Sequence, residues 1–131
     1  MTPEPGSVHH VTLTVTDATR SADWYQSLLG PATVVERRGE TWHRLRMQWP
    51  SGLVIGVTQH QSATPMRFDE MRVGLDHIGI ACASEDEVAA WVTHMDSLGI
   101  EHGPLEDVPY GWAVTARDPD AIPIEFFCSK P

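Results

Sequence analysis

The sequence has few cysteines and no long hydrophobic run. Its two cysteines, Cys82 and Cys128, form no CxxC pair and are too few for a disulfide framework, so we expect free thiols in a reducing cytoplasm. No apolar stretch approaches the roughly 18 residues that a membrane-spanning helix needs. Residues 1–10 also lack the basic start and the apolar stretch of a signal peptide. We therefore expect neither a membrane protein nor a secreted one.

Positive charge is scarce as well. The 131 residues include 18 acidic and 9 basic side chains, for a formal net charge of −9. Charges balance over residues 1–60, so the excess of acid lies in residues 61–131. Because no basic stripe is available to neutralise phosphates, we expect neither nucleic acid nor an anionic membrane surface as a partner. A small molecule remains as the expected ligand.

What the sequence does contain is an internal repeat. Residues 9–15 are echoed by residues 76–82, and in each segment a histidine, His10 or His77, opens a strict alternation of apolar residues. Such alternation is typical of a half-buried strand. Trp24 and Trp91 show the same offset of 67 residues as the two histidines. The repeat indicates that one structural module occurs twice.

Each repeated strand is followed by a helical pattern and then by further extended segments. Ser84 and Glu87 form a capping-box signature, and Gly30 and Gly99 are placed to end the two helices. The expected helices cover residues 19–29 and 84–98, and the expected later strands cover 33–37, 41–49, 53–60, 101–102, 111–117 and 122–128. We predict a single α+β domain over 1–131. It comprises two βαβββ modules, about 7–60 and 75–129, joined by a linker over 61–74. They form a cup-shaped mixed sheet with helices on the outer face.

Alternation also predicts which side chains face the cavity of this sheet. The Val, Leu and Ile faces of the strands must be covered by the helices, so the opposite faces line the cavity. The inner face then holds His10, Arg44, Arg46, Trp42, His60, His77, Glu125 and Phe127. Cys82 and Cys128 fall on the helix side, where we expect buried packing.

Two histidines and one glutamate converge in this arrangement. His10, His77 and Glu125 are the ligand types of a facial triad, in which two imidazoles and a carboxylate bind one face of a divalent metal. The opposite coordination positions stay open for a substrate. Such a metal acts as a Lewis acid or activates dioxygen.

On these motifs the sequence resembles the vicinal oxygen chelate superfamily, which includes glyoxalase I, bleomycin-resistance proteins, fosfomycin-resistance transferases, methylmalonyl-CoA epimerase and extradiol dioxygenases. The resemblance runs from about Val8 to Phe127. It is carried by residues 10–17, 24–30, 75–78 and 117–126.

The resemblance implies a metal site made by His10, His77 and Glu125, with Gly56 at the position of a fourth ligand. Glycine cannot bind a metal, which counts against a lactoylglutathione lyase, whereas two histidines and one glutamate resemble the extradiol dioxygenase set. The implied cofactor is Fe(II) or Mn(II), with Zn(II) or Ni(II) as alternatives, and the implied assembly is a homodimer. His60 stands close to the position of that family's acid–base histidine.

The remaining expectations concern the substrate. Arg44 and Arg46 are expected to hold an anionic or carbonyl-bearing substrate, and Trp42, Tyr110, Trp112 and Phe127 are expected near the pocket. Two other functions stay open, namely a metal-free antibiotic-binding protein like the bleomycin-resistance branch and a metal-dependent isomerase or lyase. His43, His94 and His102 fit no cluster and are expected at the surface.

Overall fold

The computed structural model describes residues 1–64 and 66–131 and divides the chain into two compact units. Unit 1 is Met1–Pro65 and unit 2 is Met66–Pro131. Their boundary falls inside the linker predicted over 61–74. None of the helices in the described residues is long and apolar enough to cross a membrane.

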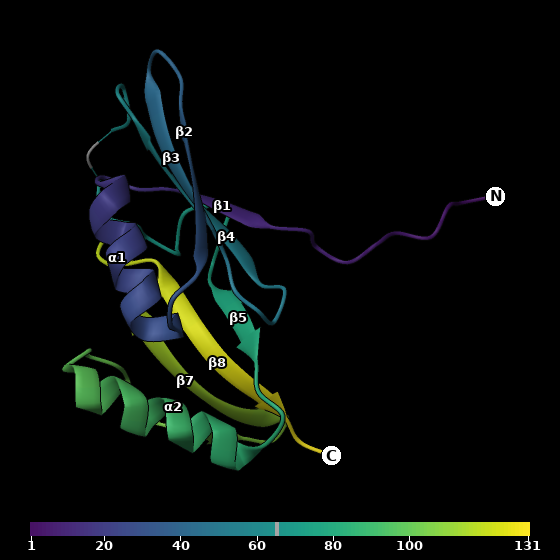
Figure 1. Ribbon diagram of the computed structural model, residues 1–131. Helices are drawn as coiled ribbons and strands as arrows, with labels where there is room; N and C mark the ends of the chain where they lie inside the picture. Colours follow the sequence, from purple (N-terminus) through teal and green to yellow (C-terminus); the bar gives the residue numbers. More distant parts are fainter. Residues whose placement is uncertain (65) are drawn as a thin grey trace. The chain divides into compact units, whose positions relative to one another are not determined.

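Unit 1 is a four-stranded mixed sheet with one helix (Figure 1). Its elements are β1 (Val11–Thr14), α1 (Ala18–Leu29), β2 (Thr33–Arg38), β3 (Trp42–Gln48) and β4 (Val54–His60). The strand order is β1-β4-β3-β2, and only the β1–β4 pair is parallel. Residues 1–10 precede the sheet as an exposed segment.

Unit 2 repeats this topology. Its elements are β5 (Ile78–Ala81), α2 (Glu85–Leu98), β6 (Glu106–Val108), β7 (Gly111–Arg117) and β8 (Pro123–Ser129). The strand order is β5-β8-β7-β6, with β5 parallel to β8. The predicted α+β class and the two βαβββ modules are therefore confirmed.

The strand registers of the two units coincide as well. Thr12, two residues after His10, pairs with Gly56, and Gly79, two residues after His77, pairs with Glu125. Gly56 and Glu125 therefore occupy equivalent positions in their modules. The register thus places a glycine in unit 1 where unit 2 has a glutamate.

α2 starts and stops at the residues that the sequence marks, and α1 starts at Ala18, one residue before the predicted start, and ends at the predicted Gly30. The Asp17 side chain accepts a hydrogen bond from the Arg20 amide at the start of α1 (3.0 Å), and the Ser84 side chain accepts one from the Glu87 amide at the start of α2 (3.2 Å). At the other end of α2, Gly99 adopts a left-handed conformation (φ 67°), and its amide is directed at the carbonyls of the last turn. These caps fix where each helix lies in the chain.

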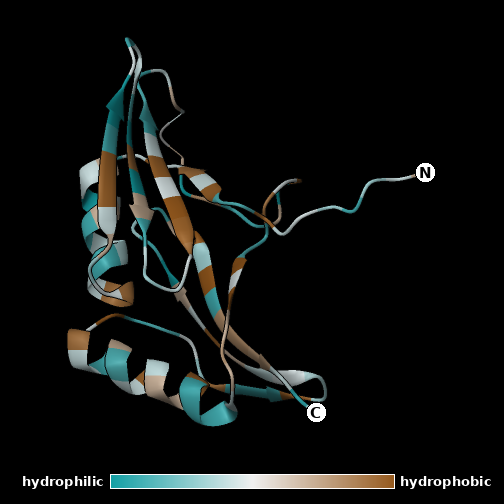
Figure 2. Cartoon of the chain, turned by 45° about the vertical axis from the view of Figure 1, so that its right-hand side comes forward, coloured by the Kyte–Doolittle hydropathy of each residue, from teal (hydrophilic) through white to brown (hydrophobic). Residues whose placement is uncertain are grey.

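Each helix covers one face of the sheet in its own unit. α1 packs on β3 and β4 through Tyr25 and Leu28, which are fully buried with Met47 and Ile55. α2 packs on β7 and β8, where the Trp91 ring stacks on Phe126 with centroids 4.1 Å apart. Figure 2 shows hydrophobic and hydrophilic residues alternating along the long strands, so the helix-covered faces are the apolar ones.

The structure corrects one strand prediction and confirms the burial predicted for the two cysteines. The strand expected over 101–102 is only a single bridge, His102 to Ala116, and the edge strand lies instead at β6. Cys82 and Cys128 are buried, as their strand parity predicts, and both are free thiols.

Candidate functional site

The polar face of unit 2 brings together two of the three predicted metal ligands. His77 immediately precedes β5, and Glu125 lies in the middle of β8, directly opposite Gly79. The His77 Nε2 atom lies 3.6 Å from Glu125 Oε1. The carboxylate lies beside Gly79: a Cβ at Gly79 would be 3.9 Å from Glu125 Oε1, an ordinary van der Waals contact.

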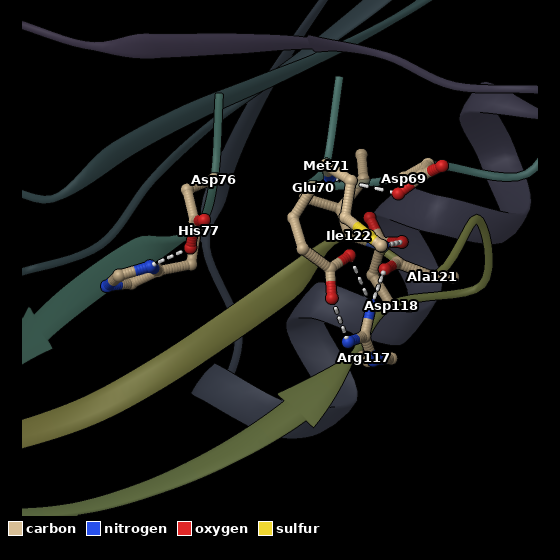
Figure 3. Close-up of polar contacts among 9 residues, drawn as sticks. All are labelled: Asp69, Glu70, Met71, Asp76, His77, Arg117, Asp118, Ala121 and Ile122. Atoms are coloured by element: carbon tan, nitrogen blue, oxygen red, sulfur yellow. Dashed lines mark hydrogen bonds and ion pairs between the residues drawn. The ribbon is translucent and has the colours of Figure 1, made fainter. Parts of the chain in front are cut away.

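A third residue orients the imidazole of His77. The Nδ1 atom of His77 lies 2.6 Å from Asp76 Oδ1 (Figure 3). When this carboxylate accepts the Nδ1–H proton, the neutral ring carries its lone pair on Nε2, the nitrogen that faces Glu125. The contact with Asp76 therefore favours the tautomer whose Nε2 lone pair faces Glu125.

Two donor atoms of unit 2 have a separation that suits two ligands of one divalent metal. Two ligand atoms about 2.0–2.2 Å from one metal and about 90–110° apart are separated by about 2.8–3.6 Å. The Nε2–Oε1 separation of 3.6 Å lies at the upper end of this range. In residues 1–64 and 66–131 no group of three or more His, Cys, Asp or Glu side chains is arranged to hold a metal. Unit 2 thus provides a ligand pair, and His10, the third predicted ligand, is an exposed residue of unit 1.

A hollow of about 380 Å³ lies beside Glu125 in unit 2. Its lining includes Gly79, Ala81, Glu125 and Phe127. The Phe127 ring occupies the space above Gly111, where a Cβ would come within 2.5 Å of it, and it contacts the exposed Tyr110 with ring centroids 6.2 Å apart. Phe127 and Tyr110 therefore form an aromatic pair on the face that carries the carboxylate.

Trp112, expected near the pocket, lies on the other face of the sheet. It pairs with Cys128, whereas Thr115 pairs with Glu125. Side chains of adjacent strand residues point to opposite faces, so Trp112 falls on the helix side with Cys128. There the Lys130 ammonium lies 5.2 Å from the centre of its ring, and Lys130 also pairs with Asp107. Trp112 is thus separated from Glu125 by the sheet.

The polar face of unit 1 carries the predicted substrate-binding arginines. β3 and β4 pair Arg44 with Thr58 and Arg46 with Gly56. The Arg44 Nε–H donates to Thr58 Oγ1 (2.8 Å), and the Arg44 guanidinium lies 4.9 Å from the centre of the Trp42 ring. These contacts confirm the predicted parity, because they place Trp42, Arg44 and Thr58 on one face.

His60 ends the same strand, β4. It pairs in register with Trp42, and it is exposed. The register therefore places it on the same face as Arg44, which matches the face predicted from the alternation. The structure adds no hydrogen-bond partner for the His60 ring among the described residues.

Two further polar contacts stabilise unit 2. The Arg117 guanidinium donates to both carboxylate oxygens of Glu70 (2.6 and 3.1 Å) and to the carbonyl of Ala121, as Figure 3 shows. The hydrogen bonds from Arg117 lower the pKa of Glu70 to about 2. Nearby, the Phe68 amide donates to the Asp120 carbonyl (3.0 Å). Together these contacts fasten the segment before His77 to the turn between β7 and β8.

His102, expected to be an isolated surface histidine, is held at both ring nitrogens. Its Nε2 lies 2.7 Å from Asp96 Oδ1, and its Nδ1 lies 2.6 Å from the carbonyl of Gly103. Hydrogen bonding to Asp96, followed by that to Gly103, raises the pKa of His102. The side chain links the end of α2 to the segment beside β7.

Sequence reasoning missed two residues of the candidate site, Asp76 and Thr58. An acid directly before a candidate histidine ligand is a readable signal for Asp76, because metal-bound imidazoles usually donate their second N–H to a carboxylate or carbonyl. Thr58 shares the inner face with Arg44 by parity. Its contact with Arg44 depends on the register between β3 and β4, which alternation alone does not provide.

Comparisons with known proteins identify relatives over nearly the whole chain. The family model of the Glyoxalase/Bleomycin resistance protein/Dioxygenase superfamily matches residues 7–126. The crystal structure of a glyoxylase/bleomycin resistance protein/dioxygenase domain from Frankia sp. EAN1pec is 31% identical, covers 97% of this chain and 100% of its own, and has a TM-score of 0.88.

More distant structures share the fold. A glyoxalase family protein from Enterococcus faecalis is 21% identical, with 92% of this chain and 96% of its own covered and a TM-score of 0.75. A third structure is a mutant of the fosfomycin resistance protein FosX from Listeria monocytogenes, complexed with Mn(II) and 1S,2S-dihydroxypropylphosphonic acid. It is 20% identical, with 94% of this chain and 90% of its own covered and a TM-score of 0.66. No curated protein matches the sequence significantly.

Proposed function

We propose that this chain, which belongs to the Glyoxalase/Bleomycin resistance protein/Dioxygenase superfamily, is a metal-dependent enzyme. Its substrate would be a small molecule with adjacent oxygen atoms. The observation that carries the proposal is the pair of His77 Nε2 and Glu125 Oε1, 3.6 Å apart, with Asp76 on the other nitrogen of the imidazole. The Listeria protein of the same fold holds Mn(II) in its crystal structure, which supports a divalent metal.

His77 and Glu125 would hold the metal, and we propose His10 as the third ligand. When bound, such an ion supplies Lewis-acid chemistry or activates dioxygen. Fe(II) or Mn(II) suits two imidazoles and one carboxylate, and Zn(II) or Ni(II) is the alternative. Because this ligand set resembles that of extradiol dioxygenases, we propose a catechol-like substrate first and an isomerase or lyase reaction second.

The other polar residues have separate roles in this proposal. Arg44 and Arg46 would orient the substrate through their guanidinium groups. Trp42, Phe127 and Tyr110 would pack against its apolar part. Phe127 lines the hollow beside Glu125, and its ring contacts Tyr110. His60 would move a proton as a general acid–base group, the role that histidine takes most often in enzymes.

Metal analysis of protein purified without chelator is the direct test. We expect about one metal ion per chain, taken up from added Fe(II), Mn(II), Zn(II) or Ni(II) if it is lost in purification. Glu125→Gln and His77→Ala should lose the metal, and Glu101→Gln, at an exposed position, should keep it. His10→Ala should weaken binding. Failure of the wild-type chain to bind any of the four metals would overturn the proposal.

Oxygen uptake in the presence of a panel of catechols then separates the reaction classes. Ring cleavage with consumption of dioxygen supports the dioxygenase reaction, whereas turnover without oxygen consumption supports an isomerase or lyase. His60→Gln should lower kcat by about 10²–10⁴-fold and leave metal content unchanged if His60 is the acid–base group. Unchanged kcat would exclude that role for His60.

A metal-free antibiotic-binding function is the second candidate. The aromatic pair of Tyr110 and Phe127 beside the Glu125 carboxylate favours it, because such a surface suits a cationic aromatic drug. Stoichiometric drug binding that survives both EDTA and Glu125→Gln would support this function. We also propose a homodimer, which sedimentation should reveal as a species of twice the 14.5 kDa chain mass.

A further inference from the structure

Three arginines share the polar face of unit 1, and two of them stand directly opposite each other. Arg37 on β2 pairs in register with Arg44 on β3, and Arg46 follows two residues later on the same face. We call Arg37, Arg44 and Arg46 the arginine face. Like charges directly opposite each other on neighbouring strands destabilise a sheet. The arrangement is therefore unfavourable unless an anion offsets it.

The acidic residue nearest in sequence does not neutralise this face. Glu36 lies on the other side of β2, where its carboxylate binds Arg38 (2.9 Å) and His43 (3.0 Å). No ion pair joins an acid to Arg37, Arg44 or Arg46 among residues 1–64 as described. On one face of β2, Arg38 thus forms an ion pair with Glu36. On the other face, the charges of the arginine face have no ion pair with an acid among the described residues of unit 1.

Arg44 is held in place by neighbours that are themselves well packed. Its Nε–H is donated to Thr58, which is 1% exposed, and its guanidinium lies near the Trp42 ring. Trp42 in turn packs on Gly39, where a Cβ would overlap its indole. With Nε occupied by a neutral hydroxyl, the terminal amino groups of Arg44 remain for a second acceptor. A fork of this kind binds carboxylate, phosphonate or phosphate through two oxygens.

Small side chains neighbour Arg46 on this face. Arg46 pairs with Gly56, and a Cβ at Gly56 would lie 3.1 Å from the Thr12 hydroxyl, so the Thr12 side chain fills the space over Gly56. The hydroxyls of Thr12 and Thr58 thus lie on the face that carries the guanidinium groups.

We propose that the arginine face binds an oxyanion group of the substrate, a carboxylate or a phosphonate, and so selects an anionic substrate. The inference rests on the proposed function only in taking the bound anion as part of the substrate. The anion site itself consists of residues of unit 1, whereas the ligand pair His77 and Glu125 belongs to unit 2. The two proposals can therefore fail separately.

The test uses the full chain and small oxyanions as probes. Acetate, methylphosphonate and inorganic phosphate are titrated by calorimetry at constant ionic strength set with chloride. We expect saturable binding of at least one probe, and Arg37→Gln or Arg46→Gln should weaken it by about tenfold or more. The matched control is Arg38→Gln, on the same strand but the opposite face, which should change the Kd by less than about twofold. Preference for acetate identifies a carboxylate group, and preference for methylphosphonate or phosphate identifies a phosphorus oxyanion.

Thermal unfolding without probes gives a second readout. Removal of one like charge should raise the Tm of Arg37→Gln and Arg46→Gln in low salt, whereas Arg38→Gln, which loses an ion pair, should not gain stability. No saturable binding of any probe, or equal weakening by Arg38→Gln, would overturn the inference. Metal binding without oxyanion binding would support the proposed function and overturn this inference. Oxyanion binding without metal binding would support this inference and overturn the proposed function.

Discussion

At the scale of single residues, the candidate metal site depends on a carboxylate next to a ligand. Asp76 Oδ1 contacts the nitrogen of His77 that faces away from Glu125. The adjacent residue therefore decides which nitrogen carries the proton. A facial ligand set gains affinity when its imidazoles are fixed in this way.

We expect Asp76→Ala to weaken divalent metal binding by about 10–100-fold, the usual effect of losing such a carboxylate partner. Asp76→Asn keeps an oxygen that accepts the Nδ1–H bond and should recover most of the affinity. A competition titration with a coloured chelator measures both Kd values, and Asp86→Ala, on the exposed first turn of α2, is the control. Equal metal affinity of Asp76→Ala and the wild type would exclude a role of Asp76 in metal binding.

His102 gives a pH dependence whose sign follows from its contacts. Both ring nitrogens face acceptors, so only the imidazolium donates to Asp96 and Gly103 at once. The folded chain thus raises the pKa of His102 above its ordinary 6.5. The resulting stability is fully present below about pH 6.5 and is lost as the pH rises through the folded-state pKa.

The expected outcome is a Tm that falls as the pH increases from about 6 to 9, with part of that slope absent in His102→Gln. Differential scanning calorimetry across this range measures it. His94→Gln, on the same helix as Asp96, serves as the control because it leaves the Asp96–His102 contact intact. An identical pH slope for wild type and His102→Gln would contradict the assignment.

At the scale of elements, the cap of α2 links sequence and structure most directly. Ser84 accepts a hydrogen bond from the Glu87 amide, while the Glu87 carboxylate accepts one from the Ala83 amide (2.6 Å). The first bond satisfies an amide that the first turn of a helix leaves without a partner, and the second holds the residue that precedes the cap. α2 in turn covers the apolar face opposite Glu125.

Ser84→Ala should lower the free energy of unfolding by about 1 kcal/mol, the usual cost of removing an N-cap side chain. In a chain of this length the Tm should fall by about 3–5 °C. Thr93→Ala is the matched control within α2: its hydroxyl bonds the Ala89 carbonyl at an exposed position, and alanine has the higher helix propensity. A loss of stability in the control as large as in Ser84→Ala would show that the cap is unimportant.

At the scale of the whole molecule, metal binding should be visible in global stability. A ligand that binds only the folded state stabilises it by about 2.7 kcal/mol when its free concentration is 100 times Kd. Addition of EDTA should therefore lower the Tm of metal-loaded protein, and Mn(II) or Zn(II) should restore it. Glu125→Gln should show no response to either reagent. A Tm that does not change with metal or chelator would argue against a bound ion.

Much of this architecture can be predicted from the sequence. The offset between His10 and His77, the caps at Ser84 and Gly99 and the alternation of β4 and β8 determine two βαβββ modules. They also determine that Glu125 occupies the place of Gly56. Such signals are local: a helix cap spans a few residues, and alternation has a period of two.

Only the tertiary structure decided which residues from distant segments meet. The contacts of Arg44 with Thr58 and of Glu70 with Arg117 join residues 14 and 47 positions apart. The register of β7 against β8 places Trp112 on the face of the sheet opposite to Glu125. Alternation states which residues share a face but not which strand lies alongside or in which register. That choice depends on the burial of all strands together, because a shift of one residue exchanges the faces of a whole strand.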